Sequence, residues 1–331
     1  MNFYICNLEQ MGNVSLLCLT CTGNALIIVK RNRSAFFLAM KGVLPVFTIG
    51  NDRVALVTDT SCDLSDEQLA AYDIRYVCLR VTSSKGEFRD RAEISQDALY
   101  ALLKEELPKT SLPLPEDVSA LYRQLQSEGC TRVLHLSMSS GLSGTYNMVR
   151  IMAEDFPDMK IDVVDTHTLS CGLGLLVLEA AECLQNGMPV EEVISRVEHL
   201  RGTQLGTFVI RTLEFLRKGG RIGLVEGVVG TLLQLKPVIF VNDEGVYQTL
   251  AKARGFNNAL NTMYDEIMKR YEGHPVRLAV VHGAAYDDAV KLRDRICEKL
   301  NVVSSFISPV SPALAIHTGP GLIGAIVQYA E

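Results

Sequence analysis

Residues 133–150 read VLHLSMSSGLSGTYNMVR and join a short apolar run to a helical pattern through a turn of small residues. The opening VLHL predicts a buried strand, and Leu142, Tyr146 and Val149 recur at the spacing of one helical face. A strand that passes directly into a helix in this way is the repeating unit of α/β folds. The stretch therefore predicts the fold class of the region around it.

The turn inside this stretch carries four hydroxyl side chains and two glycines: Ser139, Ser140, Ser143, Thr145, Gly141 and Gly144. The start of a helix leaves backbone N–H groups unpaired and bears a partial positive charge, and glycine lets a ligand approach the backbone closely. The turn is therefore suited to bind an anion. The alternative interpretation is that Ser140 is an ordinary N-cap and that the glycines only allow close packing.

Strands and helices alternate on both sides of this stretch. Apolar runs predict strands at residues 54–59, 76–81, 133–136 and 161–165, and amphipathic patterns predict helices at 95–107, 116–127, 173–185 and 190–201. The alternation predicts a parallel sheet whose ligands bind beyond the carboxyl ends of its strands. Further strands, a hairpin around residues 242–245 and helices at 257–271 and 286–300 make up a second half.

The first fifty residues do not share this pattern. Residues 11–29 carry no charge, and Lys30, Arg31 and Arg33 follow them. A secretory signal has its positive charges before the apolar core, so this order argues against one. A membrane anchor is the alternative, because the run almost has the length to span a bilayer. Since several polar residues dilute the run, we expect an extension read from an early start codon, with the domain beginning near Arg53.

Charge and cysteine content narrow the function classes. The net charge of −6 argues against nucleic acid as the main partner, because neutralising phosphates needs a basic surface. The nine cysteines are scattered without the look of a disulfide framework, which indicates reduced thiols and a cytoplasmic protein. Cys18 and Cys21 form a CxxC pair, but no second pair follows, so we predict no metal site.

Seven motifs, taken together and in order, resemble the DegV family of bacterial fatty-acid-binding proteins. Four lie in the first half, including the opening stretch, and three lie in the second half. In order they are VTDTSCDLS (57–65), TSLP (110–113), LSMSSGLSGTY (136–146), DTHTLSCGLG (165–174), TLEFLRKGGRIG (212–223), KPVIFVNDEG (236–245) and HTGPG (317–321). Each motif alone is weak, whereas seven in the family's order are specific. The resemblance covers residues 53–331.

The resemblance implies a two-domain α/β protein that buries one long-chain fatty acid between its domains. We accordingly expect an extension at 1–52, a parallel-sheet domain at 53–203 and a second α/β domain with a mixed sheet at 204–331. Such a protein is not itself an enzyme and uses no cofactor. It presents the acyl carboxylate to a separate ATP-dependent fatty acid kinase, and the acyl phosphate produced passes to an acyltransferase of phospholipid synthesis. Contact with a membrane would be at most transient.

The site roles implied by the resemblance fall on named positions of this chain. Thr110, Ser143 and His317 would hold the carboxylate. Arg221 and Arg254 would lie near the phosphoryl group or face the kinase. The supporting loops would contribute Ser61, Ser140 and Gly144. This set agrees with the physics of the ligand, because a buried carboxylate needs several converging donors and the acyl chain needs only an apolar slot.

Two other functions are alternatives to that of a fatty-acid carrier. A serine-dependent acyl hydrolase would use Ser143 with Asp165 and His317, but the G-x-S-x-G pattern of a nucleophile elbow fails because Thr145 stands at the second glycine position. A nucleotide-binding enzyme would need a phosphate-binding loop, and neither GxxxxGK[ST] nor GxGxxG follows a strand. The carrier is therefore the favoured hypothesis.

Overall fold

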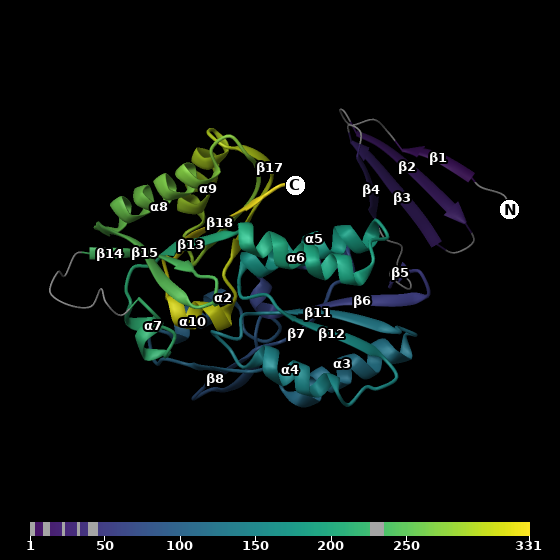
Figure 1. The fold of residues 1–331 in the computed structure, drawn as a ribbon, viewed down its shortest axis with the longest axis horizontal. Helices are drawn as coiled ribbons and strands as arrows, with labels where there is room; N and C mark the ends of the chain where they lie inside the picture. The colour runs from purple at the N-terminus through teal and green to yellow at the C-terminus, as the bar shows by residue number, and fades with distance from the viewer. Residues whose placement is uncertain (1–3, 9–13, 22–23, 32–33, 39–45, 226–234) are drawn as a thin grey trace. The chain divides into compact units, whose positions relative to one another are not determined.

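The computed structural model describes the backbone of residues 4–8, 14–21, 24–31, 34–38, 46–225 and 235–331, with side chains from residue 46 onward (Figure 1). The chain forms two compact units. The first comprises residues 1–46 and 66–74, and the second comprises residues 47–65 and 75–331.

The first unit contains an antiparallel sheet and one short helix. Its strands follow one another in sequence order and are β1 (Tyr4–Leu8), β2 (Val14–Cys21), β3 (Asn24–Arg31) and β4 (Ser34–Leu38). Helix α1 (Asp66–Ala71) begins directly after Ser65, as its two acidic first-turn residues predict. The run considered as a membrane anchor lies partly outside the described residues, and elsewhere its backbone forms β2 and β3. Within the described ranges, no helix combines the length and apolar character needed to span a bilayer.

The second unit begins with the predicted parallel sheet. Strands β6 (Asp52–Asp59), β11 (Arg132–Ser137) and β12 (Lys160–Asp165) pair in parallel, in the order β12-β11-β6. On the far side of β6, strand β7 (Arg75–Val77) pairs in parallel, while β5 (Phe47–Ile49) forms an antiparallel hairpin with its start. Side chains of β6 and β11 are buried almost throughout, as expected for central parallel strands.

Helices cover both faces of this sheet (Figure 1). On one face lie α3 (Pro115–Ser127) and α4 (Thr145–Ala153), and on the other lie α5 (Cys171–Gln185) and α6 (Val190–Thr203). Helix α5 is buried along most of its length because it stands between the two sheets of this unit, contacting β11 of one and β16 of the other.

A small antiparallel sheet was not foreseen. The predicted strand at 76–81 is in fact two, since Leu79 leaves the first sheet by donating its backbone N–H to Thr60 Oγ1 at 3.1 Å. Beyond that break, β8 (Arg80–Ser83) pairs with β9 (Gly86–Arg89) and β10 (Lys109–Ser111). Neither partner strand is among the strands that the sequence predicts. Helix α2 (Gln96–Leu102), capped by Ser95, lies between them in sequence.

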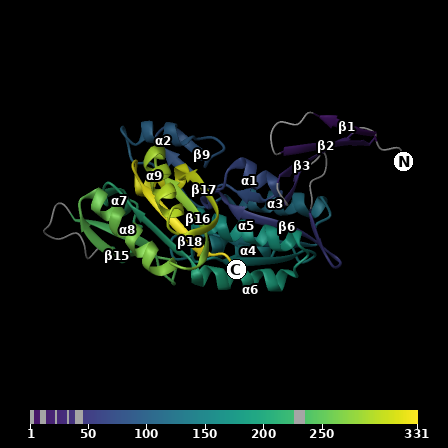
Figure 2. The ribbon, with the colours of Figure 1, turned by 90° about the horizontal axis from the view of Figure 1, so that it is seen from above.

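The second half folds around a six-stranded mixed sheet in the order β15-β14-β13-β18-β16-β17. Its strands are antiparallel except for the parallel pair β16–β17: β13 (Leu205–Val209), β14 (Leu235–Val241), β15 (Tyr247–Arg254), β16 (Pro275–His282), β17 (Asn301–Pro309) and β18 (Ile323–Tyr329). Helices α8 (Phe256–Tyr271) and α9 (Tyr286–Cys297) cover one face (Figures 1 and 2). The expected α/β fold with a parallel first sheet and a mixed second sheet is confirmed.

Two short helices complete the second half, α7 (Glu214–Lys218) and α10 (Pro312–Thr318). They contact each other, and α10 also contacts α2, β8 and β10. Helix α10 is buried at every residue. Helix α10 belongs to the second half of the chain, and through these contacts it packs against the small sheet of the first half.

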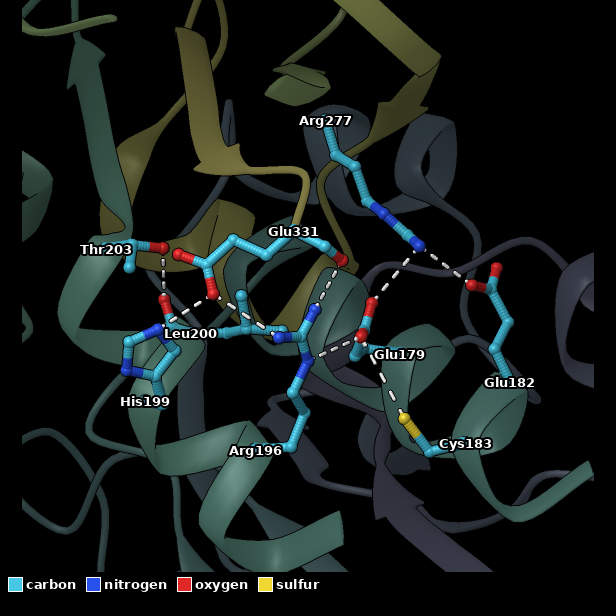
Figure 3. Close-up of polar contacts among 9 residues, drawn as sticks. All are labelled: Glu179, Glu182, Cys183, Arg196, His199, Leu200, Thr203, Arg277 and Glu331. Carbon is cyan, nitrogen blue, oxygen red and sulfur yellow. Dashed lines mark hydrogen bonds and ion pairs between the residues drawn. The ribbon is translucent and has the colours of Figure 1, made fainter. Parts of the chain in front are cut away.

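A network of ion pairs ties the chain's end to α5, α6 and β16 (Figure 3). The buried carboxylate of Glu179 accepts from Arg196 Nε at 3.0 Å and lies 3.2 Å from Arg277 Nη2. Arg196 Nη2 also donates to the backbone oxygen of Glu331 at 2.7 Å, and His199 Nε2 lies 2.9 Å from the Glu331 carboxylate. Because Glu179 has two guanidinium partners, its buried charge is compensated.

The close approach of α5 to the loop after β6 predicts the effect of one substitution. At Gly174 a Cβ would lie 2.6 Å from the carbonyl oxygen of Cys62, so Gly174→Ala should lower the free energy of unfolding by about 1–3 kcal/mol. Gly202→Ala in α6 is the control, because nothing lies within 4 Å there and alanine should add up to about 1 kcal/mol. Urea unfolding midpoints measure both. Equal or greater stability of Gly174→Ala would contradict the packing described.

Candidate functional site

A cavity of about 230 Å³ lies where the two halves of the second unit meet. The first half contributes residues from the small sheet and the strand-end loops, and the second half contributes residues from α10 and the β14–β15 region: Leu79, Thr110, Ser111, Leu112, Met138, Leu142, Ser143, Leu169, Arg221, Tyr247, Ala313, Leu314 and His317. Four of the five residues that the resemblance assigned to carboxylate or phosphoryl contact lie in this wall. Thr110, Ser143, Arg221 and His317 are brought together from four separate segments, the first and last of which lie 207 positions apart.

A second, smaller cavity of about 40 Å³ shares three wall residues with the first, namely Leu169, Tyr247 and Leu314. Its remaining wall is mainly apolar: Phe208, Val241, Val281, Val310, Leu322 and Ile326, with Gly206 and four hydroxyl residues. Three of those hydroxyls are already hydrogen-bonded within the protein, Ser170 to Asp63, Thr207 to the Ala325 carbonyl and Thr318 to the Leu314 carbonyl. The two cavities therefore lie next to each other. The first has one polar wall, and the wall of the second is mainly apolar.

His317 and Thr110 form the polar wall. His317 Nε2 lies 2.9 Å from Thr110 Oγ1, and the ring is buried. Burial lowers the pKa of His317 to about 4, and the positive charge of Arg221 contributes further, so the imidazole is neutral at pH 7. The other ring nitrogen, Nδ1, is buried without a hydrogen-bond partner in the described structure. Gly219 packs against it so closely that a Cβ there would lie 2.2 Å from Nδ1.

Ser143 stands at the mouth of the turn that opens α4. Its Oγ lies 2.8 Å from Thr145 Oγ1 and accepts a hydrogen bond from the Thr145 amide at 3.3 Å. Helix α4 begins at Thr145 with Gly144 as its N-cap, so the alternative in which Ser140 caps the helix is wrong. Leu142, predicted on the helical face, instead lines the cavity from the turn. Across the described residues, Ser143 Oγ makes no hydrogen bond to a histidine or a carboxylate.

The two arginines occupy different places. Arg221 lines the cavity, with Nη1 donating to the Gly219 carbonyl at 2.7 Å and Nε at 3.5 Å from the Leu142 carbonyl. Arg254 ends β15, is exposed, and is not part of the cavity wall. The resemblance assigned both arginines to the phosphoryl or kinase-facing side, whereas only Arg221 lies in the cavity wall.

The three supporting residues act on the backbone around the cavity. Ser61 is fully buried, and both its amide and its hydroxyl donate to Asp59 Oδ1, at 3.0 and 2.5 Å. Asp59 Oδ2 in turn accepts from the amide of Met138, a wall residue, at 2.9 Å. Ser140 is exposed, and its amide donates to Asp165 at 3.2 Å. Gly144 is the N-cap of α4 and a Cβ there would make ordinary contact with Leu112.

Sequence reasoning missed two buried carboxylates that hold α10, the helix carrying His317. Asp63 Oδ1 accepts from the Ser311 amide at 2.8 Å, and Asp90 Oδ1 accepts from the Ala313 amide at 2.9 Å. Burial raises the pKa of Asp63 to about 7 and that of Asp90 to about 6. Asp63 stands in the motif VTDTSCDLS, but a motif cannot show that its partner lies some 250 positions later.

The arrangement contains no group of His, Cys, Asp or Glu suited to hold a metal within the described ranges. Asp165 and His317, which a hydrolase would need beside Ser143, are not joined to it or to each other in those ranges. Asp165 instead accepts from the backbone amides of Ser140 and His167. What the cavity wall offers is one neutral imidazole, one guanidinium and the hydroxyls of Thr110, Ser111, Ser143 and Tyr247, which together suit a small anionic group.

Comparison with known proteins identifies the family of this chain. Residues 53–330 match the model of the family described as "uncharacterised protein, DegV family". A DegV domain-containing protein of Clostridium acetobutylicum is 34% identical over 276 residues, covering 83% of this chain and 99% of the relative.

Solved structures extend the likeness to three dimensions. A DegV family protein from Thermus thermophilus, described by its fatty acid binding, superposes with a TM-score of 0.80 at 34% identity, covering 84% of this chain and 99% of that one. A stearic-acid-binding protein from Eubacterium ventriosum gives a TM-score of 0.77 at 26% identity, covering 83% and 98%. From residue 53 onward, the chain belongs to the DegV family.

Proposed function

We propose that this protein binds one long-chain fatty acid and presents its carboxylate to a separate ATP-dependent fatty acid kinase. The observation that carries the proposal is the pair of adjacent cavities that share Leu169, Tyr247 and Leu314 as wall residues, one with a polar wall and the other mainly apolar. A fatty acid has the same division along its length. The fatty-acid binding named for the relatives from Thermus thermophilus and Eubacterium ventriosum supports the assignment.

The carboxylate is assigned to the wall formed by Thr110, Ser143 and His317. Burying a carboxylate without partners is prohibitive, and these side chains supply three hydrogen-bond donors. Because His317 is neutral, it can offer one N–H, which we place on Nε2 toward Thr110 and the ligand. The acyl chain then extends past Tyr247 into the apolar cavity, where each buried methylene stabilises the complex by about 0.8 kcal/mol.

The kinase step is assigned to the side of the cavity where Arg221 lies. A planar, permanently charged guanidinium suits a phosphoryl group, whereas an acyl chain needs none. Arg254, exposed at the end of β15, is assigned to the surface that faces the kinase. The acyl phosphate would pass to an acyltransferase of phospholipid synthesis, which places the protein in the cytoplasm with at most transient membrane contact.

The first prediction is that the purified protein carries a long-chain fatty acid without any being added. Organic extraction and mass spectrometry should recover it near one per chain. Thr110→Val, Ser143→Ala and His317→Ala should each weaken binding on the order of 10- to 100-fold, since each removes one hydrogen bond of about 1.5–3 kcal/mol to a charged group. Thr82→Val, an exposed threonine of the adjacent strand β8, is the matched control. Background lipid alone in the unmutated protein would refute the carrier.

The second prediction separates carrier from hydrolase. Ser143 should donate a hydrogen bond and never form an acyl-enzyme, because no base lies within hydrogen-bond reach in the described structure to activate it. Incubation with a chromogenic long-chain ester, followed by intact mass, should show no adduct and no turnover above that of Ser143→Ala. Ser140→Ala in the same turn controls for loop disturbance. An acyl adduct that Ser143→Ala alone abolishes would establish the hydrolase instead.

The third prediction distinguishes the two arginines, with fatty acid kinase and ATP supplied. Arg221→Ala should keep its fatty acid and lower the maximal rate of acyl phosphate formation, because a charge near the phosphoryl group is lost. Arg254→Ala should keep that maximal rate and raise the carrier concentration that gives half of it, because only docking is weakened. If Arg221→Ala is isolated without lipid, Arg221 belongs to the carboxylate site.

A further inference from the structure

Strand β12 ends the first sheet, and its outer edge has no partner strand among the described residues. The parallel pairing with β11 shows which backbone groups face outward. The amides of Lys160 and Thr166 donate inward, to the carbonyls of Thr131 at 3.1 Å and Ser137 at 3.2 Å. Because alternate residues of a strand direct their N–H and C=O groups to opposite sides, those of Ile161, Val163 and Asp165 point to the open edge.

This edge lies at the bottom of a groove of about 650 Å³. One wall comes from α4, with Tyr146, Arg150 and Glu154, and the other comes from α6, with Ile194 and Glu198. The two helices lie on opposite faces of the sheet, so they flank the edge from both sides (Figure 1). Five residues of β12, from 161 to 165, line the groove, a length of about 16 Å.

The charges in the groove are mostly negative. Four carboxylates line it, those of Glu154, Asp162, Asp165 and Glu198, against the single guanidinium of Arg150. The Arg150 guanidinium is 3.8 Å from Glu154, and Asp162 is compensated by Arg132 from beneath at 2.7 Å. Asp165 accepts from the backbone amides of Ser140 and His167, and its carboxylate lies 3.8 Å from Nδ1 of His167, which also lines the groove. Within the described chain no hydrogen bond or ion pair involves Glu198, so the α6 wall offers an uncompensated negative charge.

We propose that this groove binds an extended, basic segment of another protein, which adds to the sheet as a strand beside β12. The added strand would bond to the outward groups of Ile161, Val163 and Asp165, and lysine or arginine side chains would reach Glu154 and Glu198. This interaction goes beyond the fatty-acid site, since the groove shares no residue with either cavity.

A second copy of this chain fits the groove less well. An isologous contact would bring four helices, two α4 and two α6, to one edge before the strands could meet. It would also place the same excess of carboxylates against itself, which is repulsive. A single extended segment of opposite charge meets neither obstacle.

The test uses the full chain and a fluorescently labelled seven-residue peptide of alternating lysine and valine, followed by fluorescence anisotropy. We expect saturable binding of this peptide. The affinity should be at least tenfold lower for a glutamate–valine peptide, and also for a lysine–valine peptide that is N-methylated at alternate backbone positions. Hydrogen exchange at Ile161 and Val163 should slow when the first peptide binds. Equal binding of the N-methylated peptide would overturn strand addition.

Two variants locate the binding. Val163→Pro removes an outward N–H and leaves the inner ladder intact, so it should reduce peptide affinity at least tenfold, while Val163→Ala keeps the N–H and serves as control. The double variant Glu154→Lys with Glu198→Lys should also reduce peptide affinity at least tenfold, although it leaves β12 unchanged. This variant keeps the proposal testable if the proline variant fails to fold. An unchanged urea unfolding midpoint reports an intact fold. Unchanged affinity in the folded variants, or self-association that Val163→Pro abolishes, would overturn the proposal.

Discussion

The carboxylate of Asp63 connects parts of the second unit that are distant in sequence. It accepts from Ser170 Oγ before α5 and from the Ser311 amide before α10, while its backbone carbonyl accepts from Ser308 Oγ. The loop after the first parallel strand, the start of α5 and the start of α10 therefore meet at one buried residue. The cavity wall depends on this meeting, because α10 carries His317 and Ser170 borders the apolar cavity.

Such burial is costly for the carboxylate, as the raised pKa of Asp63 shows. Asp90 is buried in the same way, and it accepts from the Ala313 amide, two residues after Ser311. Hydrogen bonds from backbone amides at a helix start offset part of both costs, because a negative charge is well placed there. The result is a short helix whose N-terminal end is held by the first half of the chain and whose C-terminal end presents an imidazole to the cavity.

Electrostatics at the cavity complement this support. His317 is kept neutral by burial, with Arg221 acting in the same direction, so the permanent positive charge of the wall is that of Arg221 alone. A bound carboxylate would then have hydrogen-bond donors close by and one cation beside it. The strand-end loops that complete the wall are held in turn by Asp59 and Asp165, which bond to the amides of Met138 and Ser140. Asp165 also lines the groove at β12, so the side chain that holds the Ser140 loop is at the same time part of the groove wall.

Much of this protein could be predicted from its sequence alone. Apolar runs ending in Ser- and Gly-rich turns predicted the parallel strands, and the ordered motifs predicted the family and the residues around the cavity. These features are local, so they are readable along the chain. The break between β7 and β8, the strands β9 and β10, and the separation of Arg221 from Arg254 were not readable. Each depends on a distant partner, such as Thr60 for Leu79.

The tertiary structure alone decided which residues form the shared wall of the two cavities and which edge of the first sheet has no partner strand among the described residues. Leu169, Tyr247 and Leu314 look like ordinary core residues in the sequence, because the wall of an apolar slot and a packed core have the same composition. Asp63 looks like a turn residue until Ser311 is found beside it. The outward groups of β12 become visible only once its pairing with β11 is known, because hydrophobic periodicity reports which side chains are buried and not which backbone groups remain unpaired.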